Sequence, residues 1–448
     1  MKKTYIDTAM ERIAPDLILK GGNVVDVFSG RVIKADVIIK DGIICGVGSY
    51  SGENEQDVSG KYIMPGFIDS HVHIESSMTQ PSEYAKAVMP HGITTVIADP
   101  HEITNVCGED GLEFMLKSAK NIPLDVNLML PSCVPATPFE HTGANLDAKT
   151  TQKLAPKFFG IGEMMNYPGI VSGDDETLGK LCLDIIDGHA PLLSGHELDA
   201  YASVGIKTDH ECSVVEEMTE KISKGMYILL REGTLSLDVA KLIKGVTPYT
   251  LRRCAFCTDD RFVGEIIRDG SIDHCIRKAV SLGLNNIDAI IMATLNACEI
   301  YGMKNKGAIA PSYVADIVVA DDLNLSSISQ VYKNGKLVCE NGKALFECET
   351  VDNSKVTNTV HLPKISADFF KTDVKDKFDA IELIPESIIT KKVTVSYSDS
   401  LSKVCVIERH HNLGTKGIGF VTNYGITNGA IATSIGHDSH NVIVIGDN

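Results

Sequence analysis

The chain has 448 residues, of which 44% are hydrophobic and 23% are charged, so its composition is that of a folded protein and excludes a mainly disordered chain. Acidic residues outnumber basic residues by 59 to 42, which gives a formal net charge of −17 at pH 7. This balance excludes a large nucleic-acid interface, because such an interface needs a basic face.

The sequence also argues against a membrane or secreted protein. No stretch approaches the roughly 18 consecutive apolar residues that a membrane-spanning helix needs. Residues 1–20 contain no apolar run of signal-peptide length. The 12 cysteines are spread from Cys45 to Cys405, far below the density of a disulfide-rich domain. We therefore expect a cytoplasmic enzyme with reduced thiols that acts on a small molecule, with no membrane or nucleic-acid partner.

Two β-rich segments flank the middle of the chain. Residues 16–64 are short apolar or alternating runs that stop at Gly, Asp or Ser, which is typical of strands joined by turns. Residues 308–345 show the same pattern, and Asn334-Gly335 between two apolar runs is a strong hairpin signal. We expect residues 1–64 and 306–350 to form one composite β-sandwich domain.

Residues 65–305 alternate apolar runs with helix-length segments. The candidate strands are GFIDSHVHI, ITTVIADP, DVNLMLPS, FFGIGEMM, DIIDGHA (or the PLLSGH after it), IKTDH, MYILLREG and CAFCTDD. About eight βα units over this length favour an α/β fold of the (β/α)8 TIM-barrel type, with a doubly wound sheet as the alternative.

The last part of the chain is predicted to be a third domain. Residues 351–370 are polar and are expected to form a linker. Residues 351–448 together are assigned to a C-terminal α+β domain. The sequence stops at NVIVIGDN, a predicted strand that would need neighbouring strands. We therefore expect this domain to be incomplete.

The first chemical signal is His71-Val72-His73, which follows the apolar run Ile63–Ile68. Residues i and i+2 of a strand project from one face, so both imidazoles are expected at the C-terminal end of the first barrel strand, where barrel active sites lie. Imidazole binds Zn, Fe, Mn, Ni or Cu ions. On its own the pair is a weak metal signal.

Four further potential metal ligands each end a different candidate strand. These residues are Glu163, His189, His210 and Asp259. Four such placements in register with barrel strands are hard to reach by chance. A carboxylate can also bridge two divalent ions, which lie roughly 3.5–4 Å apart in two-metal sites. Together with the His-x-His pair, the pattern predicts a metal site.

The second candidate strand ends at Asp99-Pro100-His101-Glu102, because proline has no N–H to donate to a neighbouring strand. His101 and Glu102 are therefore expected at the barrel mouth, where they contact substrate or transfer protons. The alternative is a capped helix start with a solvated pair.

MPGFIDSHVHIESSM resembles the amidohydrolase superfamily, and DPHEI, GEMMN, DGHAP, DHE, REG and CTDDR, in this order, resemble its adenine deaminase family. The similarity runs from about residue 15 to the end of the chain. It implies a metal-dependent hydrolase of cyclic amidines that converts adenine to hypoxanthine and ammonia in purine salvage or adenine catabolism. It also implies a preference for the free base, and we expect a homo-oligomer, a dimer.

The resemblance further implies which residues bind metal. The ligands of a binuclear site would be His71, His73, Glu163, His189, His210 and Asp259. Glu163 holds the place of the carboxylated lysine that bridges the metals in many relatives. The metals implied are Mn²⁺ or Fe²⁺, and Zn²⁺ is compatible, because imidazole and carboxylate do not select sharply among these ions.

The implied reaction assigns proton-transfer roles. Two divalent cations lower the pKa of a water between them, and the resulting hydroxide attacks C6 of adenine. Asp259 is the expected proton shuttle to the leaving ammonia. Glu211 and Glu232 are the candidate donors to the neighbouring ring nitrogen, with ion pairing as the alternative for both. Because neighbouring strand residues point oppositely, Glu211 faces the site only if its strand has ended.

Three alternatives stay open at this point. His437 and His440 in GHDSHN either bind an additional metal or cover the active site, unless this segment is only a loop held by its own hydrogen bonds. The reaction could instead be another amidohydrolase reaction, on a cyclic amide or an N-acetyl sugar. The chain could also be a catalytically inactive metal-binding homologue.

Overall fold

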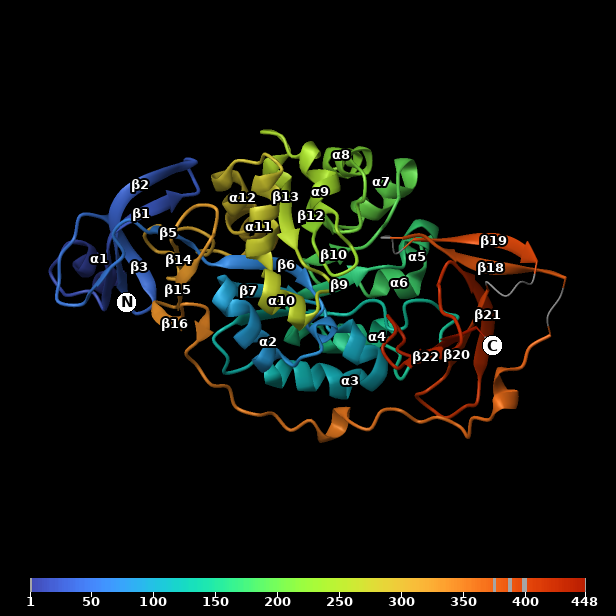
Figure 1. Cartoon of the computed structure of the whole chain (residues 1–448). Coiled ribbons are helices and arrows are strands. Elements are labelled where there is room, and N and C mark those ends of the chain that lie inside the picture. Colours follow the sequence, from blue (N-terminus) through green and yellow to red (C-terminus); the bar gives the residue numbers. More distant parts are fainter. Residues whose placement is uncertain (1, 374–375, 386–388, 397–400, 448) are drawn as a thin grey trace.

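The computed structural model describes residues 2–373, 376–385, 389–396 and 401–447. Three parts follow one another across the molecule: an N-terminal sheet, a central barrel and a C-terminal sheet (Figure 1). No helix of the described residues combines the length and the apolar character needed to cross a membrane.

The N-terminal sheet combines strands from both β-rich segments. After helix α1 (Lys2–Ala9), its strands are β1 (Leu17–Asp26), β2 (Arg31–Lys40), β3 (Ile43–Gly48), β4 (Glu55–Asp57), β5 (Tyr62–Pro65), β14 (Ile317–Ala320), β15 (Ile328–Lys333), β16 (Lys336–Glu340) and β17 (Lys343–Ala344). Their order is β17-β16-β15-β14-β5-β1-β2-β3, with β4 beside β1. The antiparallel pairing of β14 with β5 joins the two segments. The exact limits 1–64 and 306–350 stay a prediction.

The Asn334-Gly335 turn connects β15 to β16 as an antiparallel hairpin. Both residues have left-handed backbone angles, with φ of 50° at Asn334 and 73° at Gly335. This is the conformation that a two-residue type I′ turn requires, and Asn-Gly adopts it with little strain.

The central part is a barrel of eight parallel strands. These are β6 (Phe67–Val72), β7 (Ile93–Ala98), β8 (Asp125–Leu130), β9 (Gly160–Met164), β10 (Ile186–Gly188), β11 (Thr208–Asp209), β12 (Tyr227–Arg231) and β13 (Cys254–Cys257). The strands β6–β10 form one sheet and β11–β13 another. A parallel bridge between Val72 and Asp259 closes the ring, and the Lys207 N–H donates to the Ile186 carbonyl between β10 and β11. The predicted barrel is confirmed, and DIIDGHA, not PLLSGH, contains the fifth strand.

Helices cover the outside of the barrel (Figure 1). The α-helices are α2 (Pro81–Val88), α3 (His101–Ser118), α4 (Ala148–Leu154), α5 (Tyr167–Ser172), α6 (Asp175–Gly179), α7 (Gly195–Ser203), α8 (Val215–Ser223), α9 (Val239–Leu242), α10 (Val263–Asp269), α11 (Ile272–Ser281), α12 (Asn286–Met292) and α13 (Leu295–Ile300). Short 3-10 helices are η1 (Ile74–Ser77), η2 (Met89–His91), η3 (Ala155–Lys157), η4 (Ile243–Gly245), η5 (Leu251–Arg253), η6 (Ser354–Val356) and η7 (Ala367–Phe370). Fully buried side chains such as Phe67, Ile228 and Ile276 form the core between strands and helices.

The C-terminal part begins with the predicted linker, which passes along the outside of α3 (Figure 1). Its sheet has the order β19 (Thr390–Ser396), β18 (Lys377–Leu383), β21 (Lys416–Thr422), β20 (Ser402–Ile407), β23 (Val442–Gly446) and β22 (Ala430–Thr433). Its described residues contain no α-helix, so only the β part of the expected α+β domain is seen. Runs of β-branched residues in KKVTVS and NVIVIG explain the strands. β23 pairs with β20 on one side and with β22 on the other.

Candidate active site

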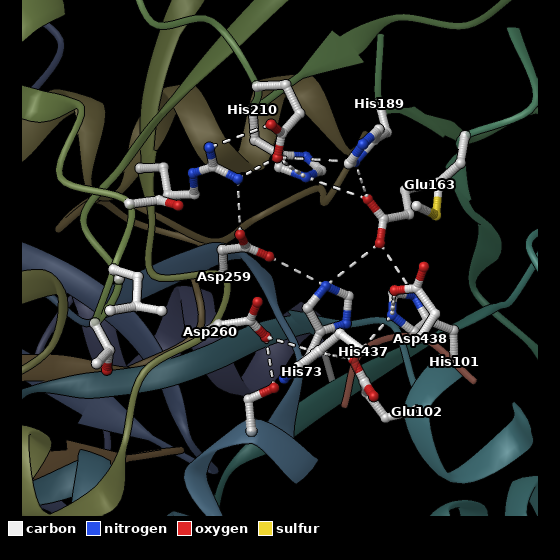
Figure 2. Close-up of a pocket in the computed structure, with 18 of the residues that line it drawn as sticks. His73, His101, Glu102, Glu163, His189, His210, Asp259, Asp260, His437 and Asp438 are labelled. Carbon is white, nitrogen blue, oxygen red and sulfur yellow. Dashed lines mark hydrogen bonds and ion pairs between the residues drawn. The ribbon is translucent and has the colours of Figure 1, made fainter. Parts of the chain in front are cut away.

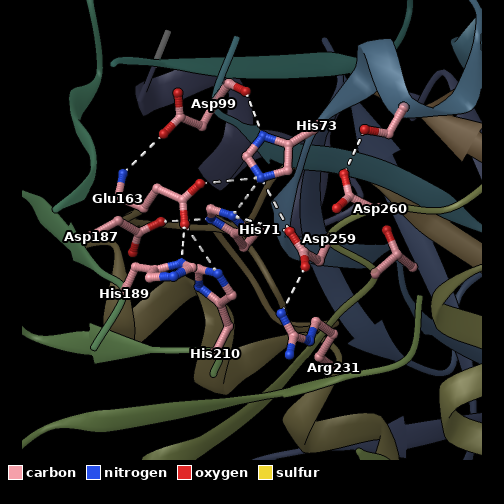
Figure 3. Close-up of polar contacts among 12 residues, drawn as sticks. His71, His73, Asp99, Glu163, Asp187, His189, His210, Arg231, Asp259 and Asp260 are labelled. Carbon is pink, nitrogen blue, oxygen red and sulfur yellow. Dashed lines mark hydrogen bonds and ion pairs between the residues drawn. The ribbon is translucent and has the colours of Figure 1, made fainter. Parts of the chain in front are cut away.

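The carboxyl ends of the barrel strands bring the predicted ligands into one cluster (Figure 3). These residues lie within or just after five strands: His71 in β6 and His73 after it, Glu163 in β9, His189 after β10, His210 after β11 and Asp259 after β13. Because the strands are parallel, their ends meet at one end of the barrel. All six side chains are buried except that of His189, which is 21% exposed.

Glu163 lies between two sets of imidazoles. Its Oε1 is 3.4 Å from His73 Nε2, whereas its Oε2 is 2.7 Å from His189 Nδ1 and 3.2 Å from His210 Nε2. Burial raises the pKa of Glu163, but His189, His101 and His210 lower it well below its usual range. Burial lowers the pKa of His189, and Glu163 raises it to about 9. An ionised carboxylate that faces a different imidazole set with each oxygen can bridge two cations.

Asp259 faces the same cluster from the opposite side. Its Oδ1 is 3.1 Å from His73 Nε2 and 3.7 Å from His71 Nε2. Its Oδ2 accepts a hydrogen bond of 2.9 Å from Arg231. Burial raises the pKa of Asp259, but His73 and Arg231 lower it well below its usual range. One oxygen therefore reaches the candidate metal site while the other is held by a guanidinium.

The side chains of His71 and His73 face each other through their Nε2 atoms. His71 Nδ1 lies 3.0 Å from an Asp187 oxygen, and His73 Nδ1 lies 2.8 Å from the Asp99 carbonyl oxygen. Both Nδ1 atoms face acceptors and therefore act as donors, which leaves two Nε2 lone pairs facing each other at 3.2 Å. A divalent cation between them, or a proton on the His73 Nε2 that faces Asp259 Oδ1 at 3.1 Å, makes the arrangement favourable.

His210 supports the same conclusion. Its Nε2 has the contact of 3.2 Å with Glu163 Oε2, but its Nδ1 makes no hydrogen bond within the described residues, although the residue is only 1% exposed. A buried polar group without a partner is costly unless another group satisfies it. Nitrogen and carboxylate oxygen donors suit divalent transition metals, so the residues present fit such ions.

Acidic residues behind the ligands orient them, and sequence reasoning missed these residues. Asp187 holds His71, and an Asp99 oxygen accepts the Glu163 backbone N–H at 2.9 Å. Gly162 allows this approach, since a Cβ there would lie 2.1 Å from Asp99 Oδ2. Partners of this kind set the orientation of metal-binding imidazoles. Asp187 lies two residues before His189 in DGH, and residues two apart in a strand point to the same face. This spacing was the sequence signal that could have placed Asp187 near the metal-ligand candidates.

The structure separates the two glutamates proposed as proton donors. β11 ends at Asp209, so Glu211 turns toward the site, with Oε1 3.6 Å from His210 Nε2. Glu232 points the other way and pairs with Lys278 of α11. Its neighbour Arg231, the last residue of β12, enters the site and binds both Glu211 and Asp259. Sequence reasoning missed Arg231, although strand alternation places it opposite Glu232.

His101 and Glu102 start helix α3 beside the cluster (Figure 2). His101 Nδ1 lies 3.0 Å from Glu163 Oε1, and its Nε2 lies 3.2 Å from Glu102 Oε1. Burial lowers the pKa of His101, but Cys133, Glu102 and Glu163 raise it well above its usual value. His196, which lies seven residues after His189, is exposed on α7 and lies outside the cluster.

A pocket with a cavity of about 290 Å³ opens above the cluster (Figure 2). The metal-ligand candidates form its floor, and Met165, Leu235 and Phe262 contribute apolar walls. Asp260 adds a carboxylate, and His437 and Asp438 reach in from the C-terminal sheet. Many converging imidazoles and carboxylates beside a few apolar side chains suit a small polar substrate.

Comparison with known proteins agrees with this geometry. Residues 62–338 match the Amidohydrolase family, and residues 383–448 match the Adenine deaminase C-terminal domain. An adenine deaminase from Clostridium acetobutylicum is 47% identical over 99% of this chain and 81% of that protein. Adenine deaminase 2 from Desulfotalea psychrophila is 45% identical over the same shares.

Solved structures share the fold at low identity. The β-aspartyl dipeptidase from Fervidobacterium islandicum AW-1 gives a TM-score of 0.53 at 19% identity, covering 75% of this chain and 98% of that one. A triazine hydrolase variant gives a TM-score of 0.54 at 15% identity, covering 73% of this chain and 96% of that one. The amidohydrolase match implies a divalent metal, for which the clusters above supply ligands. With curated relatives up to 47% identical over nearly its whole length, the chain belongs to the adenine deaminase family of the amidohydrolases.

Proposed function

We propose that this chain catalyses the hydrolytic deamination of adenine to hypoxanthine and ammonia at a binuclear divalent-metal site. The observation that carries the proposal is the position of Glu163 between two imidazole sets, with Asp259 opposite. Membership of the adenine deaminase family selects this reaction over hydrolysis of a cyclic amide or an N-acetyl sugar.

Six residues would hold the two ions. One set is His71, His73 and Glu163, and the other is Glu163, His189 and His210, with Asp259 reaching the first set. Two divalent cations, when bound, lower the pKa of a water and polarise the substrate. Mn²⁺ or Fe²⁺ is proposed, and Zn²⁺ fits the same donors.

Asp259 is proposed as the proton shuttle. Its Oδ1 faces the metal-binding imidazoles, where it can accept a proton from the attacking water and return it to the leaving ammonia. Arg231 holds Oδ2 at 2.9 Å, so the carboxylate cannot rotate freely away. The guanidinium also helps to keep Asp259 ionised.

Glu211 is proposed to handle the second proton, at the ring nitrogen next to C6. It lines the pocket, and Arg231 holds its carboxylate. Glu232 pairs with Lys278 instead, so we give it a structural role. His101 and Glu102 remain candidates for orienting groups at the pocket wall.

The proposal includes a cytoplasmic homodimer. The cysteines, all of which lie in the described residues, form no disulfide, which suits a cytoplasmic location. The aromatic side chains of Phe139 and Tyr249 are 90% and 89% exposed, which suits burial against a second copy of the chain. Light scattering is expected to give twice the 48.4 kDa chain mass. A monomer mass would refute the dimer.

The test is adenine turnover by purified protein reconstituted with Mn²⁺ or Fe²⁺, followed by the loss of ultraviolet absorbance. An Asp259→Asn variant runs beside it, with metal content measured for both. We expect turnover that the variant loses. A folded protein loaded with two ions that releases ammonia from no purine would support the inactive alternative, and release only from cytosine or dihydropyrimidines would support another amidohydrolase reaction.

A further inference from the structure

Glu102 is the meeting point of two distant parts of the chain. Its side chain is only 1% exposed, and three imidazoles contact its carboxylate. His101 Nε2 lies 3.2 Å from Oε1, His437 also contacts Oε1, and His440 contacts Oε2. We call residues 436–441, which join β22 to β23, the C-terminal loop. Two of the three imidazoles thus come from the C-terminal sheet, 335 and 338 positions away in sequence.

The contacts continue from Glu102 to the floor of the pocket. His101 is 2% exposed and has a carboxylate at each ring nitrogen, Glu102 at Nε2 and Glu163 at Nδ1. Figure 2 shows His101 between these two carboxylates, with His437 and Asp438 on the outer side. A continuous line of polar contacts therefore runs from the C-terminal loop to the carboxylate proposed to bridge the metals.

We propose that His437 and His440 are positioning residues for the reaction: they hold the Glu102 carboxylate, which fixes the His101 ring against Glu163. This inference rests on the proposed function. The C-terminal sheet then belongs to the catalytic unit, because the barrel alone leaves two of the contacts to Glu102 unmade. Groups that orient metal-site residues need such support to keep their geometry.

Other contacts dock the C-terminal sheet without touching Glu102. His411 Nε2 lies 3.1 Å from the Thr142 carbonyl oxygen, and the Asn441 side chain donates to the His141 carbonyl oxygen at 2.8 Å. These contacts also join the sheet to the barrel. A variant at His411 is therefore a matched control that weakens docking and leaves Glu102 unaltered.

His440 gives the sharper test, because it contacts Glu102 but does not line the catalytic pocket. His437 contacts Glu102 and also lines the pocket, so a change there could affect substrate directly. We expect His440→Ala to lower kcat about 10- to 100-fold, with a smaller change in KM and two ions still bound. His440→Gln keeps an N–H donor near the Nε2 position and is expected to recover most of the loss. His411→Ala is expected to keep kcat. An equal fall of kcat in His411→Ala would overturn the proposal, since docking alone would then explain the effect.

A double-mutant cycle separates this inference from the proposed function. In a Glu102→Gln background, His440→Ala is expected to lower kcat no further, because its effect passes through Glu102. The wild type, the two single variants and the double variant are also compared by Tm. The effects of Glu102→Gln and His440→Ala on Tm are expected to be non-additive, whether or not the protein turns over adenine. No turnover by the wild type would refute the proposed function alone, whereas additive effects in both kcat and Tm would refute the positioning role.

Discussion

The floor and the rim of the pocket are built in different ways. The floor consists of metal-ligand candidates at the ends of barrel strands, all between residues 71 and 259. The rim joins the start of α3 to the C-terminal loop through contacts that span more than 300 positions. The floor is thus a product of one barrel, and the rim depends on how two domains pack. Changes at the floor should lower metal content as well as turnover, whereas changes at the rim should lower turnover alone.

The largest effect is expected for Glu163→Gln. The amide cannot offer negative charge to both imidazole sets, so the second ion loses its shared ligand. We expect metal content to fall below two ions per chain and kcat to fall on the order of 10⁴- to 10⁶-fold, as when a member of a catalytic unit is removed. Elemental analysis and adenine turnover check both. Two tightly bound ions in the variant would show that Glu163 is no bridge.

Asp259→Asn should have the next largest effect. The amide still accepts a hydrogen bond from Arg231 but is a poor proton acceptor, so kcat should fall about 10²- to 10⁴-fold. Metal content should fall less than in Glu163→Gln, because Asp259 reaches the His71 and His73 side of the cluster, whereas Glu163 faces both sets of imidazoles. Single-turnover kinetics on metal-loaded protein measures the chemical step. Loss of both ions would instead make Asp259 chiefly a ligand.

Most of the floor could be predicted from the sequence because strand ends carry their own signal. In a strand, period-2 alternation places His71 and His73 on one face, and each later ligand follows an apolar run. The same rule explains why Glu232 lies outside the cluster. Arg231 ends β12 on the inner face, so the next residue, Glu232, points outward to Lys278. Glu211 faces inward because β11 stops at Asp209, a strand end that periodicity alone does not locate.

The rim could not be predicted in the same way. The contacts of Glu102 with His437 and His440 depend on the packing of a separate sheet against α3, which no local pattern encodes. The sequence marked GHDSHN as a candidate for covering the site or binding metal, without identifying its partner. The C-terminal strands themselves follow from β-branched runs, and their pairing order, with β23 between β20 and β22, is again a property of tertiary contacts.

A matched pair of glutamate variants tests whether Glu211 has a catalytic role and Glu232 a structural one. Glu211→Gln should lower kcat about 10²-fold, because it removes a carboxylate that lines the pocket. Glu232→Gln should leave kcat nearly unchanged and lower Tm, because it weakens a largely buried pair with Lys278. Turnover and thermal unfolding of both proteins check this. Equal losses of kcat would return Glu232 to the catalytic candidates.

Asp187→Asn tests the support beneath the floor. The amide can present its NH₂ group to His71 Nδ1 and so favour the wrong imidazole tautomer. We expect metal affinity to fall about 10- to 100-fold, as for other partners of metal-binding histidines, and turnover to recover at high metal concentration. Competition with a chelator measures the affinity. Turnover that stays low at saturating metal would show that Asp187 acts on the reaction itself.

The smallest effect is expected for Lys355→Met, which removes the ion pair of 2.7 Å between the linker and Asp110 of α3. Both side chains are exposed, and exposed pairs contribute little because water and salt screen them. If the rim depends on the C-terminal loop, this change farther along α3 should alter neither kcat nor Tm measurably. A loss of kcat like that of His440→Ala would mean that the linker, not the imidazoles on Glu102, positions the C-terminal sheet. The comparison of these two variants therefore decides whether the rim is held by specific contacts at the pocket or by the general attachment of the domain.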